Sequence, residues 1–344
     1  MPRFLMKSTL IDIHGLKKYF TVQTGFLSGN RSVIKAVDGV SLSIFRGETM
    51  GLVGESGCGK STLGRLILRL EEPTGGRIFF EGEDIFTFSG MNLKNYRKKV
   101  QIIFQDPYAS LNPRRTAGNT IGEALLVNKI KYGKEREDEV ARVMDIVGLT
   151  REQKDRYPHE FSGGQRQRIG IARALVLRPK LIVADEPLSA LDVSIQAQIL
   201  NLLKELQKEF NLTYLFISHD LSVVRHISDR IAVMHFGKIV ELAENRELYG
   251  HPLHPYTMEL LSAVPIPDPQ RKKQRPMQDV EITGTTDAPG GCPFHPRCPV
   301  KVEMCDKDEP ELKDCGDGHF VACHMEGCKY AAQISRTIYS HTNP

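Results

Sequence analysis

The chain has 344 residues, which exceeds the usual size of one hydrophobic core and predicts one large domain with an appendage. Apolar residues make up 40% and charged residues 26%, as in ordinary globular proteins. The net charge of +4 is small for this length and does not indicate nucleic-acid binding, and no run of about 18 apolar residues predicts a membrane span. Residues 1–16 lack the apolar core of a signal peptide, so we expect a cytoplasmic protein.

Short apolar runs between turn residues predict strands along much of the chain. Strands are expected at residues 10–16, 33–45, 49–53, 77–81, 99–104, 181–184 and 213–217, and a hairpin is expected from 231–235 and 238–242 across Phe236-Gly237. Between residues 118 and 177 the pattern changes to helical, and Val140, Val143 and Met144 lie on one predicted face before Gly148 ends that helix. Strands alternating with helices predict a mostly parallel α/β sheet with a helical insertion at about 106–176.

A glycine-rich loop follows the predicted strand at 49–53. Residues 54–62 read Gly-Glu-Ser-Gly-Cys-Gly-Lys-Ser-Thr and open a helix, which is the context of a phosphate-binding loop. Glycines let backbone N–H groups surround an anion, and the helix N-terminus adds partial positive charge. Lys60 can reach the β- and γ-phosphates, and the Ser61 hydroxyl can bind Mg²⁺. A plain glycine turn before a helix would not need this full pattern.

Polar residues follow three of the predicted strands. Asp185 can orient Mg²⁺ and Glu186 can polarise an attacking water, although an aspartate at this point could also be a helix N-cap. The side-chain carbonyl of Gln105 suits Mg²⁺ or its water, and His219 could hydrogen-bond a γ-phosphate. All four lie where parallel strands of α/β proteins end and bind ligands.

Ser162-Gly163-Gly164-Gln165 predicts a second anion cradle at a helix N-terminus, which would serve a nucleotide held mainly by another chain. Residues 161–168, Phe-Ser-Gly-Gly-Gln-Arg-Gln-Arg, resemble the signature motif of ABC-type ATPases. Gln105 matches the Q-loop of that family, Asp185-Glu186 its second Walker motif, residues 189–192 its D-loop and His219 its switch histidine. These motifs follow the family order over about residues 10–245.

The resemblance narrows to the ATP-binding subunits of oligopeptide and dipeptide importers. Residues 105–113 resemble their Q-loop segment, and His254-Pro255-Tyr256-Thr257 resembles the segment that follows their ATPase core. Residues 292–299, Cys-Pro-Phe-His-Pro-Arg-Cys-Pro, resemble their cysteine-rich end. Residues 190–198 and 24–31 are more similar to the F-type than to the D-type subunit.

The resemblance also implies roles for individual residues. The phosphates would be held by Ser56, Gly57, Cys58, Gly59, Lys60, Ser61 and Thr62. Tyr19, with Phe20 as the alternative, would stack on adenine, and Glu186 would be the general base, acting with His219 and Gln105. Mg²⁺ would be bound by Ser61, Gln105 and Asp185. Ser162, Gly164, Gln165 and Asp192 would act on the nucleotide of the partner subunit.

Six of the seven cysteines lie between Cys292 and Cys328, which in a reducing compartment suggests metal or cluster ligation before disulfides. The resemblance implies a 4Fe-4S cluster on Cys292, Cys298, Cys305 and Cys323. Cys315 and Cys328 exceed that pattern. Structural zinc, with His295, His319 and His324 as further ligands, is the alternative, although no tight C-x₂-C pair is present.

The expected fold is therefore α/β: an ABC-type nucleotide-binding domain, with a RecA-like core, antiparallel β strands and an inserted helical subdomain, plus a small cysteine-rich iron–sulfur module. We expect the ATPase domain at 1–250, a peptide-importer segment and linker at 251–290, the cysteine-rich module at 291–330 and a tail at 331–344.

The expected function is ATP binding and hydrolysis that powers import of di- and oligopeptides, from the cytoplasmic face of the cell membrane. The partners would be a second ABC ATPase subunit, two membrane-spanning permease subunits and, indirectly, an extracytoplasmic peptide-binding protein, with no nucleic acid. One alternative is a soluble ABC ATPase acting on DNA or ribosomes, against which the chain offers one cassette and no coiled-coil insertion between Gln105 and Ser162. Another is an iron–sulfur redox-sensing ATPase.

Overall fold

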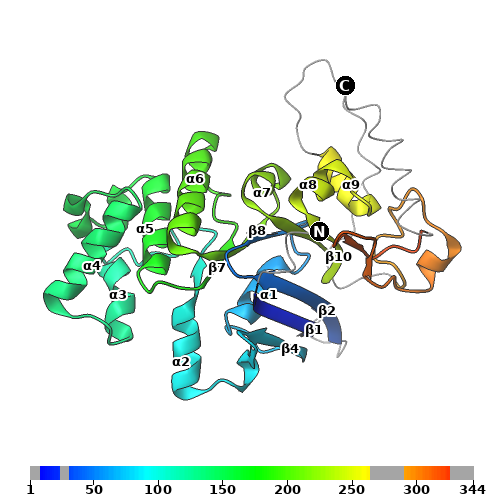
Figure 1. The fold of residues 1–344 in the computed structure, drawn as a ribbon, viewed down its shortest axis with the longest axis horizontal. Coiled ribbons are helices and arrows are strands. Elements are labelled where there is room, and N and C mark those ends of the chain that lie inside the picture. The colour runs from blue at the N-terminus through cyan, green and yellow to red at the C-terminus, as the bar shows by residue number, and fades with distance from the viewer. Residues whose placement is uncertain (1–7, 24–30, 264–289, 326–344) are drawn as a thin grey trace, which may run out of the picture. The chain divides into compact units, whose positions relative to one another are not determined.

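The structure, a computed structural model, describes residues 8–23, 31–263 and 290–325. The chain divides into two compact units (Figure 1). Unit 1 is formed from Met1–Phe45, Thr49–Phe86 and Ser218–Pro344, and unit 2 from Arg46–Glu48 and Thr87–Ile217.

Unit 1 contains an antiparallel sheet with the strand order β2-β1-β4-β5. Its strands are β1 (Thr9–Gln23), β2 (Arg31–Phe45), β4 (Gly75–Phe80) and β5 (Glu83–Asp84). Apolar side chains on alternate positions of β1 form the buried face, and Ile11 and Ile13 pair with Ile44 and Leu42 of β2. The strands predicted at 10–16, 33–45 and 77–81 are confirmed, with β1 longer than expected.

A second group of strands in unit 1 has the order β11-β12-β10-β9-β3. These are β3 (Thr49–Val53), β9 (Arg230–His235), β10 (Lys238–Glu244), β11 (Lys313–Asp314) and β12 (Phe320–Val321). β3 is buried throughout and runs parallel to β9, as its unbroken apolar sequence predicts. The predicted β9–β10 hairpin is confirmed, and both Phe236 and Gly237 have positive φ, as a type I′ turn requires.

The described residues of unit 1 form four α-helices. They are α1 (Lys60–Ile67), α7 (Leu221–Ile227), α8 (Asn245–Gly250) and α9 (Pro255–Ser262). Two short 3₁₀ turns, η1 (Ile85–Thr87) and η5 (Glu303–Asp306), lie next to β5 and in the C-terminal segment.

The C-terminal segment, residues 290–325, packs into unit 1 and is not a separate module. β12 pairs antiparallel with β10, so Val321 lies opposite Glu241 (Figure 1). Phe294 is 1% exposed and its ring contacts the rings of His235 and Tyr256. The expected iron–sulfur module was wrong: in the described residues, strand pairing and aromatic packing hold this segment on the core of unit 1, and no metal-binding group is present.

Unit 2 contains three parallel strands in the order β8-β7-β6. They are β6 (Val100–Ile103), β7 (Leu181–Asp185) and β8 (Thr213–Ser218), all predicted from the sequence. The helices are α2 (Gly90–Lys99), α3 (Ala117–Val127), α4 (Gly133–Ile146), α5 (Gly163–Leu175) and α6 (Val193–Phe210), with 3₁₀ turns η2 (Arg151–Asp155) and η3 (Pro158–Glu160).

Helices α3, α4 and α5 pack together between β6 and β7 of the chain (Figure 1). The predicted face of Val140, Val143 and Met144 is buried, which confirms the helical pattern. Beside it, the carboxylate of Glu139 accepts hydrogen bonds from Arg142 and Lys131 at 2.5 and 2.6 Å, which lower its pKa to about 2.

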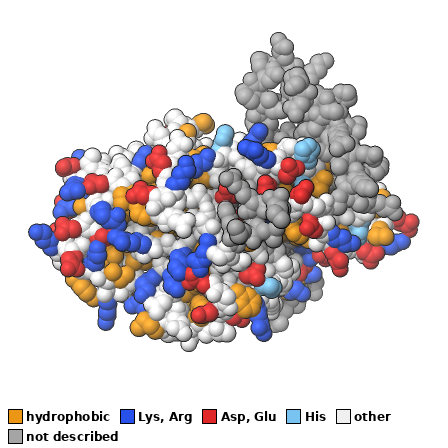
Figure 2. Space-filling view, in the orientation of Figure 1, with side chains coloured by type: hydrophobic (Ala, Val, Ile, Leu, Met, Phe, Trp, Pro, Cys, Tyr) orange, Lys and Arg blue, Asp and Glu red, His pale blue; other side chains and the backbone are white. Residues whose placement is uncertain are grey.

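The face shown in Figure 2 carries intermixed Lys, Arg, Asp and Glu side chains, in agreement with the small net charge. Within the described parts of the chain, no helix is both long and apolar enough to cross a bilayer.

Candidate functional site

The phosphate loop of unit 1 joins β3 to α1. Gly59, the residue before α1, has φ +109° and makes no side-chain cap, and the first turn of α1 contains no acidic residue. The first backbone N–H groups of a helix lack intrahelical partners and favour an anion. A Cβ on Gly59 would lie 1.9 Å from the carbonyl oxygen of Ala36, so only glycine fits this turn. The loop therefore suits a phosphate.

Lys60 places a buried positive charge within this loop. Its side chain is 4% exposed, and Nζ donates hydrogen bonds to the carbonyl oxygens of Gly54 at 2.8 Å and Glu55 at 2.7 Å. The neighbouring thiol of Cys58 is buried, and burial raises its pKa, so it stays protonated at neutral pH. The charge of Lys60 is thus available to attract the anion for which the loop is shaped.

The remaining predicted residues of unit 1 lie outside the loop. The hydroxyl of Tyr19 donates to Asp38 Oδ1 at 2.5 Å, and Lys35 Nζ lies 5.8 Å from the ring centroid. Burial and the hydrogen bond to Asp38 raise the pKa of Tyr19 to about 12. His219 follows β8 and is exposed. The hydroxyl of Tyr19 is therefore held in place by Asp38. Stacking of the Tyr19 ring on adenine remains a prediction.

In unit 2, Gln105 and Glu186 meet at the carboxyl edge of the parallel strands. β6 and β7 are paired neighbours that end beside each other, and Gln105 Nε2 donates to Glu186 Oε2 at 2.9 Å. Glu186 has φ 45°, an uncommon backbone conformation for a non-glycine residue, and its N–H donates to Ile217 O at 3.0 Å. Asp185 is the last residue of β7, so the three predicted residues share one edge.

The predicted second anion cradle is the N-terminus of α5. Ser162 accepts a hydrogen bond from the N–H of Gln165, whose side chain accepts from the N–H of Ser162, which forms a capping box. Ser162 is exposed and Gly164 is buried. Asp192 precedes α6 and is exposed, and Gln196 Nε2 donates to the carbonyls of Leu188 and Leu191. Unit 2 therefore holds this helix start and the D-loop in defined conformations.

The expected iron–sulfur site is not found in the part of the chain that the structure describes. Within residues 8–23, 31–263 and 290–325, no three or more His, Cys, Asp or Glu side chains form a group that could hold a metal ion. Burial raises the pKa of Cys292 and of Cys298 to about 11, so both thiols are protonated at neutral pH in the metal-free chain. The expected iron–sulfur module on Cys292, Cys298, Cys305 and Cys323 is therefore not shown by the described residues. Cys328 lies outside them.

The alternative of a structural zinc site is not supported either, because the three histidines proposed as ligands bond to protein groups. His319 Nε2 bonds Glu241 Oε1 at 2.7 Å, His295 Nδ1 bonds Cys292 O at 2.9 Å, and His324 Nε2 bonds Asp308 O at 2.7 Å. These histidines hold the C-terminal segment through hydrogen bonds to neighbouring protein groups.

Two contacts with the phosphate loop come from residues outside the nucleotide motifs. Tyr256 of α9 and Arg297 of the C-terminal segment both reach Glu55, through the backbone N–H and the carboxylate respectively. No spacing rule connects residues so far apart in the chain.

The phosphate loop, the strand-edge carboxylates and the α5 N-terminus define an ATP-binding cassette. The ABC transporter family matches residues 37–189. A solved dimeric ATP-binding cassette bound to ADP and Pi is 30% identical and covers 69% of this chain and 99% of its own, with a TM-score of 0.61. The structure of cbiO1 from Clostridium perfringens is 27% identical over 71% of this chain and 91% of its own, also with a TM-score of 0.61.

The C-terminal part of the chain shows to which group of ABC transporter subunits the protein is related. Residues 240–305 match the oligopeptide/dipeptide transporter C-terminal region. The oligopeptide transport ATP-binding protein AppF of Bacillus subtilis (strain 168) is 53% identical, over 93% of this chain and 98% of the relative. OppF of the same strain is 52% identical, over 92% and 97%. The chain belongs to the oligopeptide/dipeptide family of ABC transporter ATP-binding proteins, as the sequence motifs predicted.

Proposed function

We propose that this chain is the ATP-binding and ATP-hydrolysing subunit of an importer of di- and oligopeptides. The observation that carries the proposal is the phosphate loop, in which the buried ammonium of Lys60 lies inside a glycine turn that opens a helix without a side-chain cap. Family membership supports the coupling to peptide transport, because the relatives AppF and OppF are named oligopeptide transport ATP-binding proteins.

In this proposal, residues 56–62 bind the phosphates and Tyr19 stacks on adenine. The oxygens of Ser61, Gln105 and Asp185 are the donors proposed for Mg²⁺, which prefers hydroxyl, amide and carboxylate oxygens. The ion would offset the negative charge of the phosphates. The amide nitrogen of Gln105 bonds to Glu186, so its carbonyl oxygen is the atom suited to a cation.

Glu186 is the proposed general base, which accepts a proton from the attacking water. The bond from Gln105 and the bond from its own N–H to Ile217 fix the position of this carboxylate. His219 would donate a hydrogen bond from a ring N–H to an oxygen of the γ-phosphate.

Ser162, Gly164, Gln165 and Asp192 would serve the nucleotide of a second ABC ATPase subunit, either a paralogue or a copy of this chain. Support comes from the exposed, preorganised N-terminus of α5, which has no phosphate loop of its own chain within the same unit. The two proposed permease subunits would hold the assembly at the cytoplasmic face of the membrane, with an extracytoplasmic peptide-binding protein acting through them.

Purification from native membranes tests this function. A tagged chain should bring down a second ATPase subunit and two permeases, and the assembly should hydrolyse ATP faster when peptide and its binding protein are added. Lys60→Ala is the matched control, since it should assemble but lose nucleotide binding. Recovery of ribosomes or nucleic acid in place of permeases would contradict the proposal.

A further inference from the structure

Glu55, the second residue of the phosphate loop, is held on three sides within unit 1. Its carbonyl oxygen accepts from Lys60 Nζ at 2.7 Å, its N–H donates to the hydroxyl of Tyr256 at 2.9 Å, and its carboxylate accepts from Arg297 at 3.0 Å. The first bond lies inside the loop. The other two come from the region after β10, outside all the nucleotide motifs.

Tyr256 is built into the core around this contact. The residue is 0% exposed, and its ring lies 4.1 Å from the His235 ring and 5.6 Å from the Phe294 ring, measured between centroids. Burial raises the pKa of Tyr256, so the hydroxyl remains neutral and can accept the bond from the Glu55 N–H. A buried phenol with this packing cannot move away from the loop without disturbing the core.

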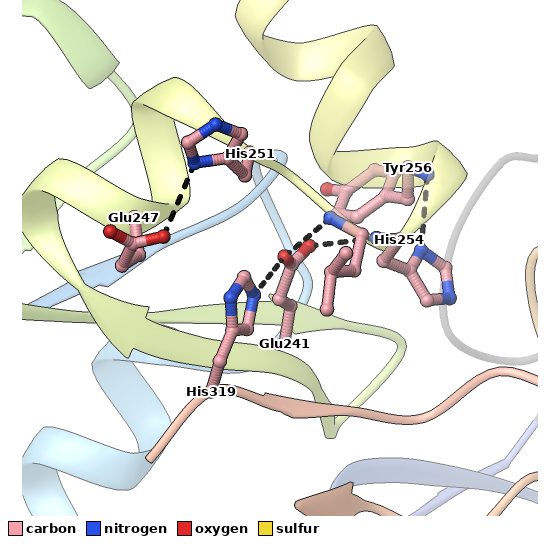
Figure 3. A network of polar contacts seen from close by, with 7 residues as sticks. Glu241, Glu247, His251, His254, Tyr256 and His319 are labelled. Carbon is pink, nitrogen blue, oxygen red and sulfur yellow. Dashed lines mark hydrogen bonds and ion pairs between the residues drawn. The ribbon is translucent and has the colours of Figure 1, made fainter. Parts of the chain in front are cut away.

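A buried carboxylate fixes the chain that leads to Tyr256. Glu241 on β10 is 0% exposed and accepts hydrogen bonds from the N–H groups of Leu253 at 2.7 Å and His254 at 3.0 Å (Figure 3). It also accepts from His319 Nε2 at 2.7 Å. His254 Nδ1 then accepts from the N–H of Tyr256 at 3.0 Å and caps α9. The start of α9 is therefore fixed to β10.

Arg297 makes the second contact from the C-terminal segment. Its guanidinium lies 3.0 Å from Glu55 and 3.8 Å from Glu259 of α9, and 5.4 Å from the centroid of the Phe294 ring. The side chain is 16% exposed, so this pair is partly shielded from water.

We propose that Tyr256 and Arg297 are positioning residues of the phosphate loop. They hold Glu55 so that the following turn, from Ser56 to Gly59, is already formed when the phosphates arrive. The C-terminal region would thereby set the affinity of the chain for ATP. This inference rests on the proposed nucleotide site and adds two residues to it that no nucleotide motif contains.

Preorganisation predicts a specific kinetic signature. A loop that has lost its anchors must be ordered by the nucleotide, which weakens binding. At saturating ATP the loop is ordered again, and the catalytic edge of unit 2 is unchanged. The KM for ATP should therefore rise much more than kcat falls.

Tyr256→Phe is the first test, because it keeps the ring and removes only the hydroxyl. The Kd of the purified full-length chain for MgATP should rise about tenfold, since one buried N–H loses its partner. Tyr249→Phe is the matched control: Tyr249 also makes a hydroxyl hydrogen bond, partly buried, which it donates to the carbonyl of Leu221 away from the loop. The control should leave the Kd unchanged.

Arg297→Gln is the second test and covers the case in which Tyr256→Phe does not fold. It should raise the Kd about fivefold, Arg297→Lys should restore part of the affinity, and the effect should disappear in a Glu55→Gln background. An unchanged Kd in both variants, or an equal rise in Tyr249→Phe, would overturn the inference alone. Failure of the wild-type chain to bind MgATP would overturn the proposed function and this inference together.

Discussion

The two units support their candidate residues in different ways. In unit 1 the phosphate loop is held from inside the same unit, by Lys60 and by residues from the far end of the chain. In unit 2, Gln105 and the helix start at Ser162 are exposed, and the hydrogen bonds that hold them come from residues of unit 2 itself, Glu186 and Gln165. The difference suggests that unit 1 is prepared to bind a ligand, whereas unit 2 presents groups that complete their role with another molecule.

The largest effect is expected in the phosphate loop. Gly59→Ala would place a Cβ 1.9 Å from Ala36 O at φ +109°, and the strain should cost about 4 kcal/mol of stability and remove ATP binding. Gly57→Ala is the matched control, because a Cβ at Gly57 meets nothing within 4 Å and only its φ of +80° is unfavourable. It should cost about 1–2 kcal/mol. Denaturant titration with and without ATP compares them, and equal losses would contradict this assignment.

In unit 2 we expect loss of turnover without loss of binding. Glu186→Gln keeps the shape of the side chain but cannot accept a proton, so ATP hydrolysis by the assembled transporter should fall about a hundredfold or more while the Kd for ATP is unchanged. Glu205→Gln, an exposed position on α6, makes the same chemical change away from the edge and should behave as wild type. Hydrolysis near the wild-type rate in Glu186→Gln would exclude the general-base role.

The units should also differ in their response to acid. Burial lowers the pKa of His235 from 6.5 to about 3 and that of His254 to about 4, so the unfolded chain takes up protons there first. The contribution of these two neutral histidines to the stability of the fold is complete above pH 6.5. It is lost as the pH falls from 6.5 toward their pKa values in the folded chain. At pH 5 the loss is about 2 kcal/mol for each histidine.

In unit 2, Glu139 has its pKa lowered from 4.5 to about 2, chiefly by Arg142, so its contribution is complete above pH 4.5 and is lost only below it. Hydrogen exchange at pH 7 and pH 5, corrected for intrinsic rates, should therefore show loosening of residues 230–244 and little change in residues 133–146. His235→Leu should reduce the difference. Equal loosening of both segments would refute this comparison.

The smallest expected effect on ATP hydrolysis is at residues 107–115, which follow Gln105 and which we propose dock a membrane-spanning permease subunit. Tyr108 and Leu111 are the large apolar side chains of this segment. Leu111 is 3% exposed and belongs to the core, whereas Tyr108 is 59% exposed and contacts Arg166. Tyr108→Ala should leave basal hydrolysis within about twofold and reduce peptide uptake about fivefold. Equal changes in both rates would argue against docking at this surface.

The features that could be predicted correctly are those that short local sequence patterns encode. The strands, the β9–β10 hairpin and the phosphate loop follow from runs of a few residues, so apolar spacing and glycine positions were sufficient. The contacts of Glu55 with Tyr256 and Arg297 join residues 201 and 242 positions apart, and no local pattern reports such pairs.

The cysteine-rich end was misread for a related reason. A cluster was expected there from the six cysteines between Cys292 and Cys328 and from the family resemblance. Phe294 and Val321 are instead buried against unit 1, and a two-residue strand such as β12 is too short to be predicted from periodicity.

The central claim is that unit 1 binds the nucleotide of its own chain, whereas the start of α5 in unit 2 acts on the nucleotide of a second subunit. Equilibrium binding of MgATP to the isolated chain tests this division of roles most directly. Lys60→Ala should abolish binding. Ser162→Arg should bind ATP as the wild type does, yet the assembled transporter carrying it should lose turnover, because this helix start would act on the nucleotide of the second subunit. If Ser162→Arg weakened binding to the isolated chain as strongly as Lys60→Ala, the division of roles between the two units would be wrong.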